Sequence, residues 1–409
     1  MTTIKTSVLA TAAALTAFAS GAFAMDVNVY GVVDLGMHWT NSNTSKHAFV
    51  MDSGITKGSR VGMRGKENLG GGYSAIFNLE TGFNADTGEF DNTSNRLFNR
   101  GASLGISAPW GKVEMGRLGA LGSGVTGSIF LNGFTPFGNL YKESQALQII
   151  NHQVMRADNM VRFESASMAG VKLYAEYSNG VSGDDSVRSS QKDRFAAVGA
   201  TYQNGPFGLV FVADNYFYNN VDNAYFDRDD SQTYNLGARY RLNDVTFYAA
   251  YQYGHKVEKL GNQMKKPGSK DATGNTKKDG SGNPTETKYD NQGFNSNAFV
   301  VGLKAKALGG ELKLQGGYAR GTSNSDSAKF EYRRSNGTLR NPPTYKHTRV
   351  KADVWQMAVG YNYPLSKSTY LYASAAYVDR TYKENGVKVE GATKTDTVKS
   401  AMFGLCHSF

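Results

Sequence analysis

Cysteine and proline are scarce in this chain of 409 residues, which has one cysteine and eight prolines. A single thiol can form neither an internal disulfide bond nor a zinc site built from cysteines. After the N-terminus there is no run of about 18 apolar residues, which a membrane-spanning helix would require. The apolar content of 40% is too high for a disordered chain. These features exclude a disulfide-rich fold, a helical membrane protein and wholesale disorder.

Glycine and tyrosine are abundant instead, with 47 and 24 residues. This composition is typical of β-structure, either one large barrel or several sandwiches. The chain has 45 lysines and arginines against 35 aspartates and glutamates, a formal charge of +10. The basic residues are dispersed along the sequence, whereas nucleic-acid binding requires them to gather in a patch. The charge therefore does not indicate a nucleic-acid partner.

The first 24 residues have the pattern of a cleaved signal peptide. Lys5 supplies a positive start, 8–18 an apolar stretch, and 22–24 (Ala-Phe-Ala) a small-residue cleavage site. The apolar stretch is too short for a membrane anchor, and no stop-transfer charges follow it. We expect residues 1–24 to be removed, leaving one exported domain, residues 25–409, with a formal charge of +9.

From residue 25 onward, apolar and polar residues alternate with a period of two. For example, Tyr234, Leu236, Ala238 and Tyr240 alternate with Asn235, Arg239 and Arg241. Similar segments lie at 27–39, 171–178, 299–306 and 355–362. In a strand, this pattern places apolar side chains on one face and polar side chains on the other. The alternation therefore predicts β-strands throughout.

The connectors between these segments alternate in length. Short links lie at 68–72, 109–111, 169–170, 205–207, 243–244, 308–310 and 364–367. Long polar links lie near 40–57, 85–95, 119–155, 180–192, 220–230, 257–293, 322–350 and 383–395. Seven short and eight long connectors join sixteen strands of about ten residues each, the pattern of a bacterial outer-membrane barrel. We predict an all-β fold, a 16-stranded antiparallel transmembrane β-barrel.

The charged face of the strands favours a membrane barrel over a soluble sandwich. A membrane barrel turns its apolar face to lipid and its polar face to the lumen. Sixteen strands enclose a lumen too wide for side chains to fill, so it should hold water. Inward charges such as Arg239, Arg241, Lys304 and Lys306 then need no buried partners.

Several motifs resemble those of the Gram-negative general porins, most of all the beta-proteobacterial branch. They are VYGVVD at 29–34, SRVGMRG at 59–65, ENLGGG at 67–72, FNLETGF at 77–83, LFNR at 97–100, GKVEMGR at 111–117 and the terminal Phe409. In combination they are specific and cover the whole mature chain, although the loops are generic. The resemblance implies a trimeric channel for passive diffusion of ions and small hydrophilic solutes across the outer membrane.

The resemblance also implies a third loop that folds into the barrel and narrows its passage. Here this loop runs from about Leu118 to Met155, and Pro136, Phe137 and Gly138 are similar to the family's constriction turn. The loop also carries apolar residues, namely Ile129, Phe130, Leu131 and Phe134. Folding inward would give them a surface on which to pack, whereas a surface flap, the alternative, would leave them in water.

In the family, a ladder of basic residues on the wall faces acidic residues of this loop. By alignment, Arg60, Arg100 and Arg156 fall on the ladder positions, and Arg64 and Arg162 extend it because they share strand parity with Arg60 and Arg156. Simple alternation places Arg100 in the apolar set, and a bulge near residue 99 would reconcile the two, so its orientation stays open.

Acidic residues are scarce on the third loop. Between Leu118 and Met155 the only carboxylate belongs to Glu143, which is adjacent to Lys142. Rings of arginine and lysine that line a pore favour anions. Inward acids do exist elsewhere, at Asp34, Asp158, Glu164, Glu176 and Glu311. We therefore predict a moderate preference for anions.

For assembly, the resemblance implies a homotrimer. The parity of Arg117 points it out of its own barrel, and the matching arginine of the family pairs with a carboxylate on the second loop of a neighbouring subunit. Asp86, Glu89 and Asp91 are the candidates, and Glu89 is favoured. The terminal strand with Phe409 resembles the signal read by the barrel-assembly machinery. Outer-membrane lipid and lipopolysaccharide are the other expected partners.

Two other classes of function compete with a channel. An enzyme would need a constellation of catalytic residues, but the six histidines are scattered and none lies in a nucleophile or metal motif. We therefore predict no catalytic activity, no cofactor and no metal. A surface adhesin or receptor that binds through long loops is the alternative to a channel; residues 257–293, with seven lysines, have the composition of a mobile solvated loop.

Overall fold

The computed structural model describes residues 25–43, 48–91, 96–182, 188, 191–219, 229–261, 264–265, 286–289, 293–330, 344–385, 387–388 and 396–409. The expected signal peptide, residues 1–24, lies outside the described residues, so its removal stays a prediction. Within these ranges, no helix is long and apolar enough to cross a membrane.

Sixteen antiparallel strands close into a barrel in the described part of the chain, which confirms the predicted fold. The first strand is β1 (Asp26–Ser42), and the second consists of two segments, β2 (Ala48–Ser53) and β3 (Arg60–Gly70). The others are β4 (Tyr73–Gly82), β5 (Gly101–Ala108), β6 (Gly111–Gly119), β7 (Arg156–Ser165), β8 (Val171–Ser178), β9 (Arg194–Asn204), β10 (Phe207–Phe217), β11 (Ser231–Leu242), β12 (Val245–Val257), β16 (Phe294–Ala307), β17 (Gly310–Phe330), β18 (Thr344–Pro364), β19 (Thr369–Glu384) and β21 (Asp396–Ser408).

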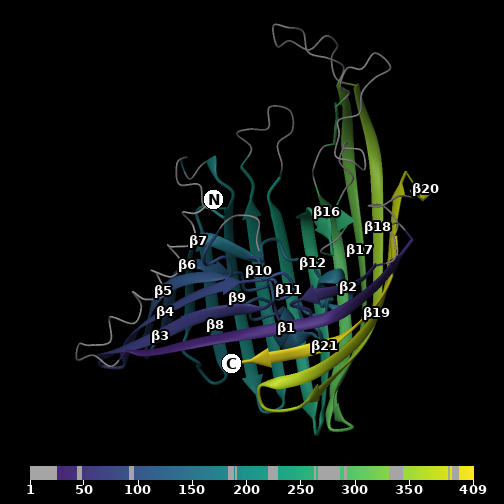
Figure 1. The fold of residues 1–409 in the computed structure, drawn as a ribbon. Coiled ribbons are helices and arrows are strands. Elements are labelled where there is room, and N and C mark those ends of the chain that lie inside the picture. The colour runs from purple at the N-terminus through teal and green to yellow at the C-terminus, as the bar shows by residue number, and fades with distance from the viewer. Residues whose placement is uncertain are drawn as a thin grey trace, which may run out of the picture.

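The barrel closes where β21 pairs with β1, from Val32 opposite Ser408 to Ser42 opposite Val398 (Figure 1). The remaining elements are short and lie in the loops. They are α2 (Leu131–Phe134), the 3₁₀ turns η1 (Lys142–Ser144) and η2 (Ala146–Gln148), and the strands β13 (Lys259–Leu260), β14 (Met264–Lys265), β15 (Glu286–Tyr289) and β20 (Val387–Lys388).

The short connectors lie where the sequence predicts them. The turn after β3, for example, consists of glycines with φ values of +85°, +58° and +82° at Gly70, Gly71 and Gly72, which residues with a side chain rarely adopt. The first long connector differs from the prediction of 40–57. β1 continues to Ser42 and β2 occupies 48–53, because apolar Phe49 and Met51 extend the outward alternation across the predicted loop.

The outer surface of the barrel is apolar. Outward side chains such as Phe211, Leu236, Phe299, Val301, Met357 and Phe403 are exposed although they are large and hydrophobic. Inward positions on the same strands alternate with them, as Val212, Asn235, Val300, Ala358 and Met402 are buried. A continuous apolar outer face on a closed antiparallel barrel is the surface that a lipid bilayer covers.

Two strands are much longer than the ten residues expected. β17 and β18 have 21 residues each and rise well beyond the rest of the barrel (Figure 1). On the outward face of β17, Leu314 and Tyr318 are followed by Arg320. The outward face of β17 therefore becomes polar at Arg320.

The main apolar core lies inside the barrel, between the third loop and the inner wall. Loop residues Leu121, Phe130, Leu131, Ile149 and Ile150 are fully buried there. They pack on inward residues of the wall, among them Ala197, Val210, Val212, Ala250, Val300 and Val354. The prediction that the loop between β6 and β7 folds inward is therefore confirmed. Its apolar side chains are removed from water by the only surface within reach, the inner wall.

Candidate functional site

The second strand of the barrel is interrupted by a short inward excursion, residues 54–59, which we call the clasp. Leu35 of β1 pairs with Ser53 and Val32 pairs with Arg60, so six residues of the clasp lie opposite two of β1. The carboxylate of Asp34 is fully buried and accepts hydrogen bonds from the backbone N–H groups of Thr56 and Lys57, both at 2.8 Å. These bonds fix the clasp against the wall.

The third loop lies in the lumen and is tied to the clasp and to strands β17 and β18. The Tyr141 N–H donates to the carbonyl of Ile55 in the clasp at 2.6 Å. The Tyr141 hydroxyl donates to Asn362 of β18 at 2.6 Å, and Lys313 of β17 donates to the same hydroxyl at 3.0 Å. Phe137 is buried and meets the Tyr141 ring edge to face, with centroids 5.3 Å apart. Tyr141 therefore joins the loop to the clasp and to the neighbouring strands β17 and β18.

Between the loop and the near wall lies a cavity of about 380 Å³. Its charged lining residues are Lys57 of the clasp, Arg60, Arg100 and Arg156. The rest of the lining comes from Gly54, Gly58, Gly124, Val125, Thr126, Asn132, Asn139, Leu140 and Met155. Four cations and no carboxylate thus line this narrowed passage. Arg60, Arg100 and Arg156 are the three predicted ladder residues, and the structure brings them together.

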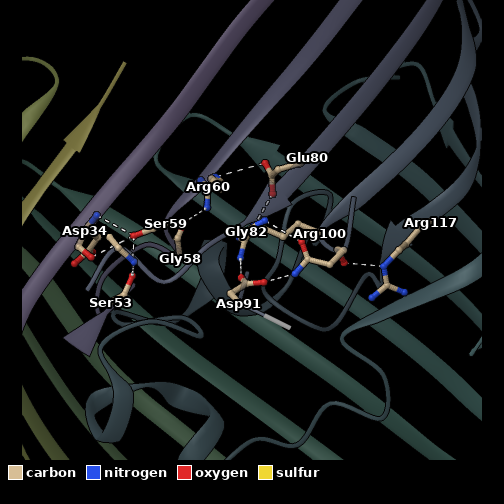
Figure 2. Close-up of polar contacts among 12 residues, drawn as sticks. Asp34, Ser53, Gly58, Ser59, Arg60, Glu80, Gly82, Asp91, Arg100 and Arg117 are labelled. Carbon is tan, nitrogen blue, oxygen red and sulfur yellow. Dashed lines mark hydrogen bonds and ion pairs between the residues drawn. The ribbon is translucent and has the colours of Figure 1, made fainter. Parts of the chain in front are cut away.

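Two of the arginines share one buried acid. Glu80 of β4 lies between them, with its carboxylate 2.8 Å from Arg100 Nε and 3.5 Å from Arg60 Nε (Figure 2). Asp91 of the second loop lies 3.5 Å from Arg100 Nη1. Arg156, in contrast, makes no ion pair among the described residues, and its Nε has no hydrogen-bond partner there. The positive charge of the passage is thus neutralised only in part.

The orientation of Arg100 is now settled by these contacts. Its side chain points into the lumen toward Glu80. The strand β5 begins one residue later, at Gly101, so the alternation that placed Arg100 with the outward residues does not reach it. Its backbone N–H nevertheless pairs with the Glu80 carbonyl at 3.2 Å, which holds it beside the acid.

The other two predicted ladder arginines do not line the cavity. Arg64 is exposed on β3, with its guanidinium 5.2 Å from the centre of the Tyr30 ring. Arg162 is buried behind the third loop, where its Nε donates to Glu176 at 2.6 Å. Shared strand parity placed both correctly on the inner face. It could not place their height, nor predict that the loop covers Arg162.

Glu143, the only acid of the third loop, is also withdrawn from the passage. Its carboxylate lies 2.9 Å from Nε2 of His38 on the wall. Burial alone would raise the pKa of Glu143, but the hydrogen bond and charge of His38 outweigh it and hold the pKa below its usual value. Glu143 therefore anchors the loop as a carboxylate. Together with the loop's lack of other acids, this leaves the cavity lining without negative charge.

The predicted constriction turn packs against the wall. Besides the buried Phe137, it contains Gly138, whose φ of +59° and closeness to the Asn132 side chain leave no room for a Cβ atom. Pro136 lies against Gly302 of β16. The turn thus positions the loop across the lumen, while Asn139 and Leu140, immediately after it, reach the cavity.

Arg117 has an acid partner within its own chain. Its Nη1 lies 2.5 Å from Asp158 of β7, and its Nε donates to the Asn99 carbonyl at 2.7 Å; it lies apart from Arg60 and Arg100 (Figure 2). Asp91 is engaged with Arg100, while Asp86 and Glu89 are exposed on the second loop. The trimer contact of Arg117 with Glu89 therefore stays a prediction.

Sequence reasoning missed two features of the site. Lys57 fell inside a segment predicted to be an external loop, and nothing in the period of two marks an inward excursion. The start of the 257–293 loop was interpreted as solvated, yet Val257 and Leu260 are buried in the core beside the third loop. Val257 and Leu260, with only Glu258 and Lys259 between them, are the apolar signal that could have indicated this. Among the described residues, no group of His, Cys, Asp and Glu is arranged to hold a metal ion.

A closed barrel with an apolar outer belt, and with an inward loop that leaves a passage lined by cations, defines a membrane channel. Comparison with known proteins agrees, because a family model described as Gram-negative porin matches residues 10–383. The chain belongs to the Gram-negative porin family and forms a passive diffusion channel in the outer membrane.

Individual relatives span nearly the whole chain. An outer membrane porin protein of Bordetella pertussis is 29% identical over 399 residues, covering 91% of this chain and 94% of the relative. Among solved structures, an anion-selective porin from Comamonas acidovorans has a TM-score of 0.61 at 20% identity and covers 94% of this chain and 100% of its own. The trimer form of OmpT from Vibrio cholerae has a TM-score of 0.55 at 16% identity, with coverage of 94% and 100%.

Proposed function

We propose that this porin passes small hydrophilic solutes with a moderate preference for anions, and that Lys57, Arg60, Arg100 and Arg156 form its selective passage. The observation that carries the proposal is the lining of the cavity by these four cations and by no carboxylate. Charges that line a narrow passage with low-dielectric walls focus the field and raise the local concentration of counter-ions.

The preference is moderate because acids lie just behind the lining. Glu80 neutralises part of the charge of Arg60 and Arg100, and Asp91 lies beside Arg100. Arg156 lacks such a partner among the described residues. A structural relative described as an anion-selective porin is consistent with this proposal. At 20% sequence identity, however, the likeness supports the shared fold and not the selectivity.

We further propose that the channel is a homotrimer assembled through Arg117 and the second loop. A related fold is known in a trimer form, which supports the oligomeric state. The exposed Glu89 and Phe90 of the second loop are available to a neighbouring subunit. Channel activity is the function that the site supports, and we propose no catalysis and no bound cofactor.

Phe409 and the outer belt account for the other proposed partners. The Phe409 backbone pairs in both directions with Gly31 of β1, at 3.0 and 3.1 Å, and its ring packs on that glycine. The last residue thus seals the barrel, a place suited to the proposed recognition by the barrel-assembly machinery. Lipid and lipopolysaccharide would cover the apolar belt.

Swelling of proteoliposomes tests the proposed selectivity. Purified protein is reconstituted, and swelling rates are compared for neutral, anionic and cationic solutes of matched size. We expect all three to enter, the anion fastest and the cation slowest. Equal rates for the anion and the cation, or faster entry of the cation, would contradict anion preference, whereas an absence of swelling would contradict a general channel.

A further inference from the structure

We infer that Lys57 is a selectivity-determining residue of the passage and that Asp34 is the positioning residue that holds it there. This inference rests on the proposed anion-preferring function and deepens it. Family alignment identified only wall arginines, whereas Lys57 comes from the clasp, an inward excursion of the second strand. Its side chain lines the same cavity as Arg60, Arg100 and Arg156.

The charge of Lys57 is not neutralised locally. Among the described residues no carboxylate forms an ion pair with Lys57; its ammonium nitrogen instead lies 5.5 Å from the centre of the Tyr370 ring. A cation held over an aromatic face keeps its full charge, because the ring supplies only a quadrupole. In this respect Lys57 resembles Arg156 and differs from Arg60 and Arg100, which share Glu80. Lys57 should therefore contribute more to the electric field in the passage than an arginine whose charge is partly neutralised by Glu80.

The position of Lys57 depends on a single buried carboxylate. Asp34 is fully buried and accepts from the backbone N–H of Thr56, the Thr56 hydroxyl and the backbone N–H of Lys57, at 2.8, 2.5 and 2.8 Å. The Tyr372 hydroxyl of β19 donates to its other oxygen at 2.7 Å. Asp34 thus holds the backbone of Lys57 by a direct hydrogen bond. It forms no ion pair among the described residues.

The rest of the clasp supports the same arrangement. The Ser59 hydroxyl accepts a hydrogen bond from the backbone N–H of Asp34 at 3.1 Å and donates one to the Asp34 carbonyl at 3.2 Å. It also forms a hydrogen bond of 3.0 Å with the Ser53 hydroxyl (Figure 2). Gly58 lies against the guanidinium of Arg100, so a side chain there would displace that arginine. The hydrogen bonds of the clasp therefore hold Lys57 at the passage. Gly58 leaves room for the side chain of Arg100.

The experiment measures reversal potentials of single channels in a planar bilayer under a potassium chloride gradient. Lys57→Gln removes the charge, Lys57→Arg keeps it, and Lys306→Gln is the matched control. Lys306 lies at the exposed end of the lumen beside Asp244, so its loss is the same charge change far from the passage. We expect Lys57→Gln to lower the ratio of anion to cation permeability about twofold, the effect of one unit charge acting over several ångströms in water.

Lys57→Arg should retain the wild-type ratio, and Lys306→Gln should change it little. An unaltered ratio in Lys57→Gln, or an equal shift in Lys306→Gln, would overturn the assignment of Lys57. The assignment of Lys57 and the proposed anion preference can fail separately in this experiment. If the wild type prefers cations, anion preference fails, yet Lys57→Gln should still shift the ratio further toward cations.

A double-mutant cycle tests the role of Asp34. Asp34→Asn should shift the ratio in the same direction as Lys57→Gln, because a neutral amide grips the clasp less well. In the Lys57→Gln background this shift toward cations should be absent, and only the small opposite shift caused by loss of the Asp34 negative charge should remain. A purely structural role of Asp34 predicts additive shifts, and that result would contradict the positioning role. If Asp34→Asn does not fold, Thr56→Val, which removes only the hydroxyl bond to Asp34, replaces it in the same cycle.

Discussion

At the residue scale, selectivity depends on how each cation of the passage is partnered. Glu80 is buried beside Arg60 and Arg100 and also accepts from the Tyr30 hydroxyl at 2.9 Å. Its presence allows two arginines to approach each other without full repulsion. Arg156 and Lys57 have no such acid among the described residues. The net field in the passage should therefore be set by the residues without acid partners.

The first prediction concerns Arg60 and Arg156. Replacing both by serine should widen the passage, raise single-channel conductance and shift selectivity toward cations. The fold should be retained, because both side chains line a cavity rather than the apolar core, so their truncation removes no core packing. Bilayer recordings measure conductance and reversal potential. Arg64→Ser, on the same wall but outside the cavity, should leave both nearly unchanged.

A double mutant with wild-type conductance and reversal potential would mean that the constriction lies elsewhere. Loss of the folded barrel, measured by its heat-modifiable mobility on gels, would mean instead that these arginines stabilise the wall.

The second prediction concerns pH and His152, which follows η2 near the end of the third loop. Burial, with the nearby charges of Lys259 and Arg156, lowers the pKa of His152 to about 4. Both ring nitrogens lack hydrogen-bond partners among the described residues. The unfolded chain binds a proton below the ordinary pKa of about 6.5, whereas the folded chain does so only near 4. Stability should therefore be full above pH 6.5 and be lost as the pH falls toward 4.

Urea unfolding of the reconstituted protein at several pH values tests this. The wild type should lose stability between pH 6.5 and 4, by at most roughly 3 kcal/mol for a shift of this size. His152→Gln should lose less over the same interval. His407→Gln, at an exposed position, is the matched control and should behave as the wild type does. Parallel curves for wild type and His152→Gln would refute a contribution from His152.

At the element scale, regular alternation made the strands predictable and the third loop only partly so. The period of two is local, because the pleat alone places successive side chains on opposite faces. It therefore correctly predicted the sixteen strands and the short turns, such as that at Gly70–Gly72. The clasp could not be predicted, because its geometry depends on Asp34 and Tyr372, which are far apart in sequence but adjacent around the barrel.

The residues of the site were likewise predictable only in part from the sequence. Arg60 and Arg156 could be placed because they begin regular strands, β3 and β7. The height of Arg64 and the burial of Arg162 could not, since parity gives the face of a strand and not the cover provided by a loop. The pairing of Glu143 with His38 joins residues 105 positions apart, and no local pattern encodes it.

The third prediction concerns the packing of the third loop. Phe137 is fully buried in a small apolar cluster with Ile55 and Tyr141. Phe137→Ala should weaken docking of the loop by about 3–5 kcal/mol, the usual cost of deleting a buried phenyl ring. The barrel itself should persist, because its strands keep their ladders of hydrogen bonds. We expect larger current fluctuations in bilayers and faster proteolysis within the third loop.

Phe90→Ala provides the control, since that ring is 56% exposed on the second loop and adds little to any core. If Phe137→Ala shows current fluctuations and proteolysis like those of the wild type, polar contacts such as the hydrogen bond between Tyr141 and Asn362 suffice to hold the loop.

At the scale of the whole molecule, the fourth prediction concerns the trimer. Arg117 is paired with Asp158 inside its own subunit, and Glu89 is exposed. If Arg117 also reaches Glu89 of a neighbouring subunit, Arg117→Ala and Glu89→Gln should each lower the temperature at which the trimer dissociates on gels. The double mutant should dissociate at about the same temperature as Arg117→Ala, because contacting residues are not additive.

An effect of Arg117→Ala alone, with Glu89→Gln like the wild type, would assign Arg117 to the intrachain pair with Asp158. Trimers of unchanged heat stability in both variants would remove this contact from the interface altogether.

A passage lined by Lys57, Arg60, Arg100 and Arg156 should make this porin prefer anions. The most direct test is the zero-current potential of the wild-type channel in a planar bilayer that separates two concentrations of potassium chloride. Potassium and chloride diffuse almost equally fast in water, so a neutral wide pore would give a potential near zero. We predict a potential of the sign that chloride permeation produces. A potential of the opposite sign would contradict it.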